Sequence, residues 1–239
     1  MTLGFLVFVH GESGPYPYPL GQLMTDLLPD LQAAADQADE PFVILAQTNT
    51  GDVNVPTGVE TAQLYYAKAH AANTALIPMY DLPLLPDDIH PTAEGRAIFG
   101  ERVAWVQEQV THGNGFDGVW PVSAIRTGTS VVVTFNRDIA ADPRGWTPDV
   151  PNLGFTYAGA SITAAAVTGP RQATLTLSTA AAGTLHYANQ QSPDADDDWS
   201  GQRGLIVHST GAASPWNARG LGVPAEIVIP AARFSMPIA

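Results

Sequence analysis

One short stretch of the sequence combines a carboxylate and a histidine at a spacing that suits acid–base chemistry. In "LPDDIHPTAEG", Asp87 stands three residues before His90, at the start of a predicted helix. In a tight loop the carboxylate can face the imidazole, orient it, and stabilise it when it takes a proton from a hydroxyl nucleophile. The sequence therefore predicts a catalytic pair, Asp87 and His90.

A second candidate is the glycine turn "HGES", which follows an apolar run near the N-terminus. It contains His10, Gly11, Glu12 and Ser13. Ser13 could be a nucleophile on a strand–turn–helix elbow, and the chain order serine, aspartate, histidine agrees with α/β-hydrolases. Such an elbow needs G-x-S-x-G, however, and Pro15 stands where the second glycine belongs.

The elements that must position these residues alternate along the first half of the chain. Short apolar runs predict strands near residues 3–9, 41–47 and 74–82, of the kind that a parallel sheet buries on both faces. Three-and-four spacing predicts helices over residues 20–38, 58–73 and 90–110, the second after a capping box of Thr57 and Glu60. This pattern indicates an α/β domain over residues 1–112. Asp87 and His90 then follow the last strand, at the carboxyl edge where open α/β sheets place their sites.

The second half of the chain has a different hydrophobic period. Its runs are short, often β-branched, and bounded by turn residues, at 130–136, 160–169, 173–178, 183–189 and 204–209. They predict an all-β sandwich over residues 119–239. The stretch 113–118, "GNGFDG", matches G-x-G-x-x-G, but a helix precedes it and a strand follows, the reverse of a dinucleotide site. We interpret it as a linker.

Composition excludes several classes of partner and site. With 23 acidic and 10 basic residues, and Lys68 as the one lysine, the chain has no basic patch for nucleic acid. The absence of cysteine removes disulfides and thiolate metal sites. No apolar run has the ~18 residues of a membrane span, and "MTLGFLVFV" lacks the charged start and cleavage site of a secretion signal.

The remaining histidines and the acidic loop have ordinary structural interpretations. His70, His112, His186 and His208 form no ligand pattern, so we expect no metal and no cofactor. The loop "DADDDW" at 194–199 has carboxylates at 194–198 that could hold calcium, but it lacks the glycine and distal glutamate of an EF-hand. Tryptophans of the β half, at 120, 146, 199 and 216, suit either sugar stacking or core packing.

Residues 5–108 resemble the SGNH (GDSL-like) hydrolases, and among them the sialate O-acetylesterase-like carbohydrate esterases. The family block D-x-x-H-P, followed by a glycine and a helix, is matched by Asp87, His90, Pro91 and Gly95, and "HGES" matches an earlier Q-G-E-S-type turn. The resemblance implies that Asp87 and His90 are two members of a catalytic triad and that the turn lines the oxyanion hole. His10 replaces the family glutamine, but its ring can still donate a hydrogen bond.

The family nucleophile is a serine that precedes this turn, after a first strand that this sequence does not contain. Three explanations are open. Another polypeptide or an upstream piece, or a second copy in a homo-oligomer, completes the sheet; the domain is a silent relic that binds sugar or serves as structure; or Ser13 is the nucleophile.

The resemblance implies an esterase that removes O-acetyl groups from a glycan by serine acylation and hydrolysis. The C-terminal region resembles β-domains of phage proteins, and suggests a virion fibre or spike at an extracellular surface that acts on host polysaccharide. The alternative is a catalytically inactive structural or receptor-binding protein of the same particle.

Overall fold

The computed structural model describes residues 3–10, 19–48, 58–85, 90–142, 150–188, 204–220 and 223–239. Its first part alternates strands and helices: β1 (Phe5–Phe8), α1 (Leu20–Ala35), β2 (Phe42–Gln47), α2 (Val59–Ala69), β3 (Thr74–Pro78) and α3 (Ala93–Thr111). This is the order that the hydrophobic pattern predicts. The α/β character of this part is confirmed.

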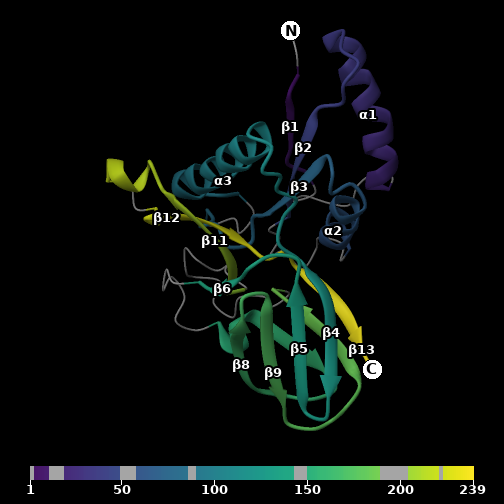
Figure 1. Cartoon of the computed structure of the whole chain (residues 1–239), viewed down its shortest axis with the longest axis vertical. Helices are drawn as coiled ribbons and strands as arrows, with labels where there is room; N and C mark the ends of the chain where they lie inside the picture. Colours follow the sequence, from purple (N-terminus) through teal and green to yellow (C-terminus); the bar gives the residue numbers. More distant parts are fainter. Residues whose placement is uncertain are drawn as a thin grey trace.

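The three strands form a parallel sheet in the order β1-β2-β3. All of β3 and all of β2 after Phe42 is buried, as expected for strands covered on both faces. In Figure 1, α1 and α2 lie on one side of the strands and α3 lies on the other. Strand β1 lies at the edge, and the side chain of Val7 is 39% exposed there.

The helix starts differ in how they are capped. Helix α3 begins after Thr92, whose hydroxyl accepts a hydrogen bond from the Gly95 N–H at 3.2 Å. Helix α2 begins after Gly58, which has φ +127° and makes no side-chain cap. The predicted capping box is therefore wrong in its first member: the N-cap is Gly58, and Thr57 lies outside the described residues. Glu60 still reaches back, since its Oε2 accepts from the Gly58 N–H at 3.4 Å.

Among the described residues after 118, the regular structure is β-strands and two short 3₁₀ turns, so the predicted change to a β-rich region is confirmed. The strands form three antiparallel sheets. The first contains β4 (Pro121–Thr127), β5 (Ser130–Phe135), β9 (Gln172–Leu177) and β8 (Ile162–Gly169). The second contains β13 (Phe234–Ile238), β10 (Gly183–Tyr187) and β7 (Phe155–Ala158). The third contains β12 (Glu226–Pro230), β11 (Ile206–Ala213) and β6 (Ala140–Ala141), with the 3₁₀ turn η2 (Asn217–Arg219) between its two longer strands; the other turn, η1 (Pro151–Gly154), precedes β7.

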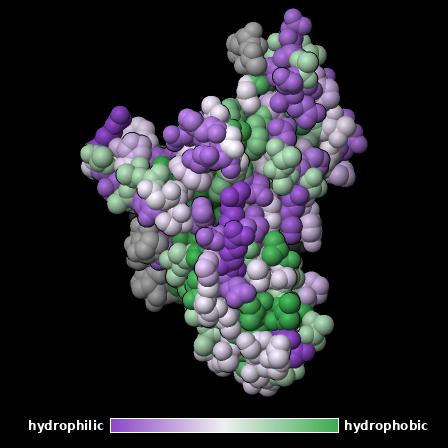
Figure 2. Space-filling view, viewed as in Figure 1, coloured by the Kyte–Doolittle hydropathy of each residue, from purple (hydrophilic) through white to green (hydrophobic). Residues whose placement is uncertain are grey.

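The third sheet is an arm that joins the β-rich region to the α/β part. Figure 1 shows β11 and β12 extending toward α3. Figure 2 shows apolar atoms gathered lower down, over the strands of the first sheet. In this first sheet, Val122 and Ile125 of β4 are 54% and 65% exposed.

Residues 113–118, predicted as a linker, pack closely against β3. The Leu76 N–H donates to the Asp117 carbonyl at 2.9 Å, which pairs this segment with the outer side of β3. Gly118, at φ +128°, lies so near that a Cβ would come within 3.0 Å of the Leu76 carbonyl. The motif has the predicted context, since α3 precedes it and β4 follows.

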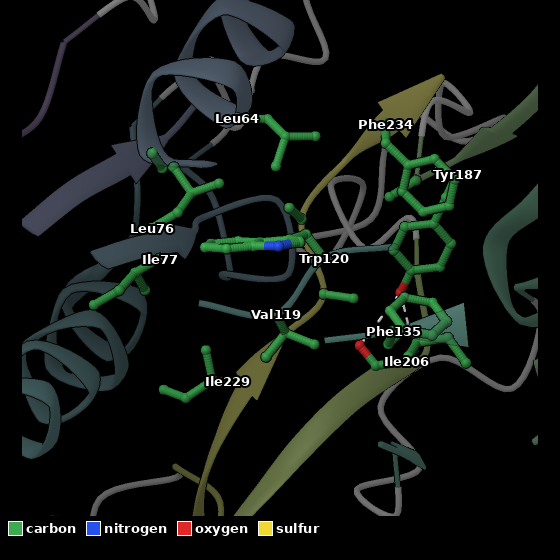
Figure 3. Packing of buried hydrophobic residues seen from close by; sticks show 14 of the residues in the cluster. Leu64, Leu76, Ile77, Val119, Trp120, Phe135, Tyr187, Ile206, Ile229 and Phe234 are labelled. Atoms are coloured by element: carbon green, nitrogen blue, oxygen red, sulfur yellow. Dashed lines mark hydrogen bonds between the residues drawn. The ribbon is translucent and has the colours of Figure 1, made fainter. Parts of the chain in front are cut away.

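Trp120 lies in the core. It is 5% exposed, and Figure 3 shows its ring close to Leu76 and Ile77 of β3 and below Leu64 of α2. The packing interpretation of this tryptophan is therefore correct. Trp146 and Trp199 lie outside the described residues.

Candidate active site

The carboxyl edge of the parallel sheet gathers the ends of three strands. His10 follows β1, Thr48 follows β2, and Tyr80 and Asp81 follow β3. The first two ends are tied together by Gln63 of α2, which is fully buried. Its Nε2 donates to the His10 carbonyl at 3.0 Å, and its Oε1 accepts from the Thr48 N–H at 2.9 Å.

The His10 ring itself is exposed. It stacks on Phe8, with ring centroids 5.8 Å apart. The backbone bond from Gln63 thus holds the start of the turn, while the imidazole faces outward. Gly11, Glu12 and Ser13 lie outside the described residues, and their place in an oxyanion hole stays a prediction.

His90 sits on a loop that closes before α3. The Leu85 N–H donates to the His90 carbonyl at 2.7 Å, and Leu84 forms an antiparallel bridge with Pro91. The His90 side chain is exposed. Asp87 lies outside the described residues, so the Asp87–His90 contact stays a prediction.

A close approach at Gly95 fixes the base of this loop. A Cβ at Gly95 would lie 2.6 Å from the Pro83 carbonyl and 3.0 Å from the Pro91 side chain. A glycine therefore lets α3 begin directly against the loop. Because β1 and β3 run in the same direction, the chain leaves both strands at the same edge of the sheet, toward the His10 turn after β1 and toward the His90 loop after β3. Direct contact between the two histidines stays a prediction.

Buried polar residues at this edge were not found by sequence reasoning. Gln47, at the end of β2, is fully buried. Its side-chain amide binds both backbone groups of Arg233: Nε2 donates to the carbonyl at 3.1 Å, and Oε1 accepts from the N–H at 2.7 Å. Thr48 Oγ1 is buried and has no hydrogen-bond partner among the described residues. The available signal was a glutamine that closes the apolar run "FVILAQ".

Two buried tyrosines complete the junction. Tyr80 donates to the Ala231 carbonyl at 2.8 Å, and its Oη lies 3.2 Å from the Oη of Tyr187. Burial raises the pKa of both phenols, that of Tyr80 far above its ordinary value. Both hydroxyls are therefore neutral donors at ordinary pH and serve packing.

The other histidines have local partners. The Nδ1 atoms of His70 and His112 lie 2.9 and 2.8 Å from carbonyls one helical turn earlier, and that of His208 lies 2.8 Å from the Asp138 carbonyl. His186 Nδ1 lies 2.7 Å from Ser235 Oγ. The described residues contain no group of three or more histidine, aspartate and glutamate side chains that could hold a metal ion. The acidic loop at 194–198 lies outside them. No helix of the described chain is long and apolar enough to cross a membrane.

Neither protein-family models nor curated proteins give a match to this chain. Among solved structures, the chain is similar to XAC1771, described as a novel carbohydrate acetylesterase from Xanthomonas citri, with a TM-score of 0.55 and 18% sequence identity. The superposition covers 88% of this chain and 44% of XAC1771, so this chain spans less than half the length of that protein. Most of the chain therefore shares its fold with part of a carbohydrate acetylesterase.

Proposed function

We propose that this chain is part of a carbohydrate esterase that removes O-acetyl groups from a glycan. The observation that carries the proposal is the fold shared with a carbohydrate acetylesterase, combined with a histidine loop that follows the last strand of the parallel sheet. Within the proposal, the finer resemblance is to SGNH hydrolases of the sialate O-acetylesterase type.

In this mechanism His90 is the general base. It takes the proton of a serine hydroxyl while the serine oxygen attacks the acetyl carbonyl, and the Asp87 carboxylate holds the ring and stabilises the imidazolium. The oxyanion receives hydrogen bonds from the His10–Ser13 turn. The imidazolium then protonates the departing sugar oxygen. Water, deprotonated by His90, hydrolyses the acetyl-serine to acetate and restores the serine.

We place the nucleophile on a strand that pairs with β1. Within the described chain, β1 pairs only with β2, whereas β3 is covered on its outer side by Asp117. On this side of β1 and just after it, the apolar residues Val7 and Val9 are 39% and 48% exposed, which favours an edge that a further strand covers. A strand there, from another polypeptide, an upstream segment or a second copy, ends at the same edge as His90.

The test is hydrolysis of p-nitrophenyl acetate by the chain alone and by its assembly with the polypeptide that supplies this strand. The assembly should turn over the ester, and His90→Ala should lower kcat at least about 100-fold, as loss of a general base does. His112→Ala removes a histidine at the C-terminal end of α3, away from the His90 loop that precedes this helix. It is the matched control and should leave activity unchanged. Brisk turnover by the 239-residue chain alone that Ser13→Ala abolishes would assign the nucleophile to Ser13 and overturn the placement on an added strand.

The second candidate is a catalytically silent structural or receptor-binding protein of a virion fibre or spike at an extracellular surface. The resemblance of the C-terminal region to phage β-domains favours it. An assembly that binds the host-surface polysaccharide but shows no ester hydrolysis in the same assay would select this candidate over the esterase.

A further inference from the structure

A cavity of about 470 Å³ lies between the middle of α3 and the β11–β12 arm, apart from the His90 loop. Helix α3 contributes Glu101, Trp105 and Glu108 to its wall, and the arm side contributes Ala212, Trp216 and Ile227. This is the size range of ligand pockets. Its two walls come from parts of the sequence about 100 residues apart, which explains why sequence patterns did not indicate it.

The wall of the cavity combines apolar side chains with carboxylates. Apart from two indole side chains it is mainly aliphatic, and the charged side chains that line it are carboxylates, which only accept hydrogen bonds. Trp105 is held edge-on against Phe116, with ring centroids 5.1 Å apart. A ligand that fits this wall must bring its own hydrogen-bond donors and an apolar surface for the indoles.

Glu101 is the fixed acceptor. The residue is 6% exposed, and its Oε1 accepts from the Ser214 hydroxyl at 2.6 Å and from the Trp216 N–H at 3.0 Å. Its Oε2 makes no hydrogen bond with the described residues. The bonds to Oε1 hold the carboxylate in place in the cavity wall.

We propose that this cavity binds pyranose rings of a glycan. The hydroxyl groups of a sugar supply the donors for the two carboxylates, and the C–H faces of its ring pack against the indoles. An organic ammonium would meet the carboxylates too. However, the Arg219 guanidinium already lies 5.0 Å from the centre of the Trp216 ring, so a second cation there would meet a like charge.

The position of the cavity suits an accessory subsite of the proposed esterase, and this part of the inference rests on that function. Trp216 packs against the cluster of Met79, Leu82 and Ile98 at the carboxyl end of β3. Gly100, the first helix residue of the cavity, lies about 10 Å along the axis from the start of α3. A glycan chain held here can extend over a few sugar units toward the His90 loop.

Gly100 offers a variant that blocks the cavity without disturbing the core. A Cβ at this position meets no atom within 4 Å, although the residue lines the cavity. Gly100→Leu should therefore fill the cavity and leave the fold intact. Glu101→Gln keeps the shape and an oxygen for Ser214 and Trp216 while it removes the charge.

The experiment is titration of the full chain with cellotetraose, chitotetraose and β-1,4-galactotetraose, followed by tryptophan fluorescence and calorimetry. At least one sugar should bind, with affinity that changes little between 50 and 500 mM salt. Gly100→Leu should weaken binding at least tenfold and Glu101→Gln at least threefold. Asp30→Asn is the control: it removes one negative charge, as Glu101→Gln does, but at an exposed position on α1, and it should not change the affinity.

Binding should persist in His90→Ala, so a failed esterase assay leaves this result standing. Three results would overturn the inference: no binding of any of the three sugars at millimolar concentration, equal binding by Gly100→Leu, or salt-sensitive binding of tetramethylammonium that Gly100→Leu abolishes.

Discussion

At the scale of single residues, the most informative contact is the buried ion pair of Asp81 and Arg102. Their side chains are 0% and 1% exposed, and the guanidinium meets both carboxylate oxygens, at 2.7 and 2.5 Å. Arg102 Nε also donates to the Val228 carbonyl of β12 at 2.9 Å. One arginine on α3 thus joins the end of the parallel sheet to the C-terminal arm.

We expect Arg102→Met to lower the free energy of unfolding by about 3–5 kcal/mol, because it leaves Asp81 as a buried charge with its main partner removed. Arg171→Met is the control: it breaks the Arg171–Asp138 pair, whose side chains are 58% and 67% exposed. That change should cost about 0–1 kcal/mol. Urea unfolding measures both, and equal effects would contradict the argument.

Tyr80 predicts a dependence of stability on pH. Burial raises its pKa in the folded state, while the unfolded phenol has a pKa near 10. Above pH 10 the unfolded chain loses a proton that the folded chain retains. The free energy of unfolding should therefore fall as pH rises past 10, by up to about 1.4 kcal/mol per pH unit for each such phenol.

Tyr80→Phe should remove the contribution of one phenol, so the free energy of unfolding should fall less steeply with pH above pH 10. It should also lower stability at pH 7, because the Ala231 carbonyl loses its donor. Denaturant unfolding between pH 8 and 11 gives both quantities. Identical slopes in the two proteins would show that Tyr80 does not titrate as proposed.

At the scale of elements, helix α3 carries two glycines in opposite environments. Gly100→Ala adds a methyl group in open space and should stabilise the protein by about 0.5–1 kcal/mol, the usual gain inside a helix. Gly95→Ala gains the same propensity but drives its Cβ to 2.6 Å from the Pro83 carbonyl. It should destabilise by about 1–3 kcal/mol. Thermal unfolding of the pair measures the difference; a stabilised Gly95→Ala would mean that the loop yields freely.

Elements were predictable from sequence where one local pattern decides them. The apolar runs of β2 and β3 are continuous because both faces are covered, so their type and parallel direction followed from sequence. The buried face of α3 was harder. It includes the charged Glu101 and Arg102, whose partners Ser214 and Val228 lie more than 100 residues away. For the site, the sequence predicted only which residues follow the strand ends. The buried amides of Gln47 and Gln63 bind backbone groups far away in the sequence, at Arg233 and His10, and no local pattern indicates such contacts.

At the scale of the whole molecule, the α/β part and the β-rich region share one core. A single buried cluster runs from Ile44 and Leu76 of the parallel sheet to Phe135 and Tyr187 of the β-rich sheets. Figure 3 shows the rings at this junction. The predicted division at residues 113–118 is a boundary in sequence pattern, and the packing crosses it through the Leu76–Asp117 and Gln47–Arg233 bonds.

This shared core predicts that the two parts unfold together. The calorimetric and van't Hoff enthalpies should agree, and the helical signal at 222 nm should vanish at the temperature where amides of β5 and β9 become exchangeable. Gln47→Leu should lower the unfolding temperature seen by the helical signal and the one seen by amide exchange to the same extent. The reason is that each backbone group of Arg233 that loses its partner costs about 1–3 kcal/mol. Two transitions, with only the helical one shifted by Gln47→Leu, would mean that the parts fold as separate domains. In that case the Arg102–Val228 and Tyr80–Ala231 hydrogen bonds would not couple the unfolding of the two parts. The β11–β12 arm would then only rest against the α/β part.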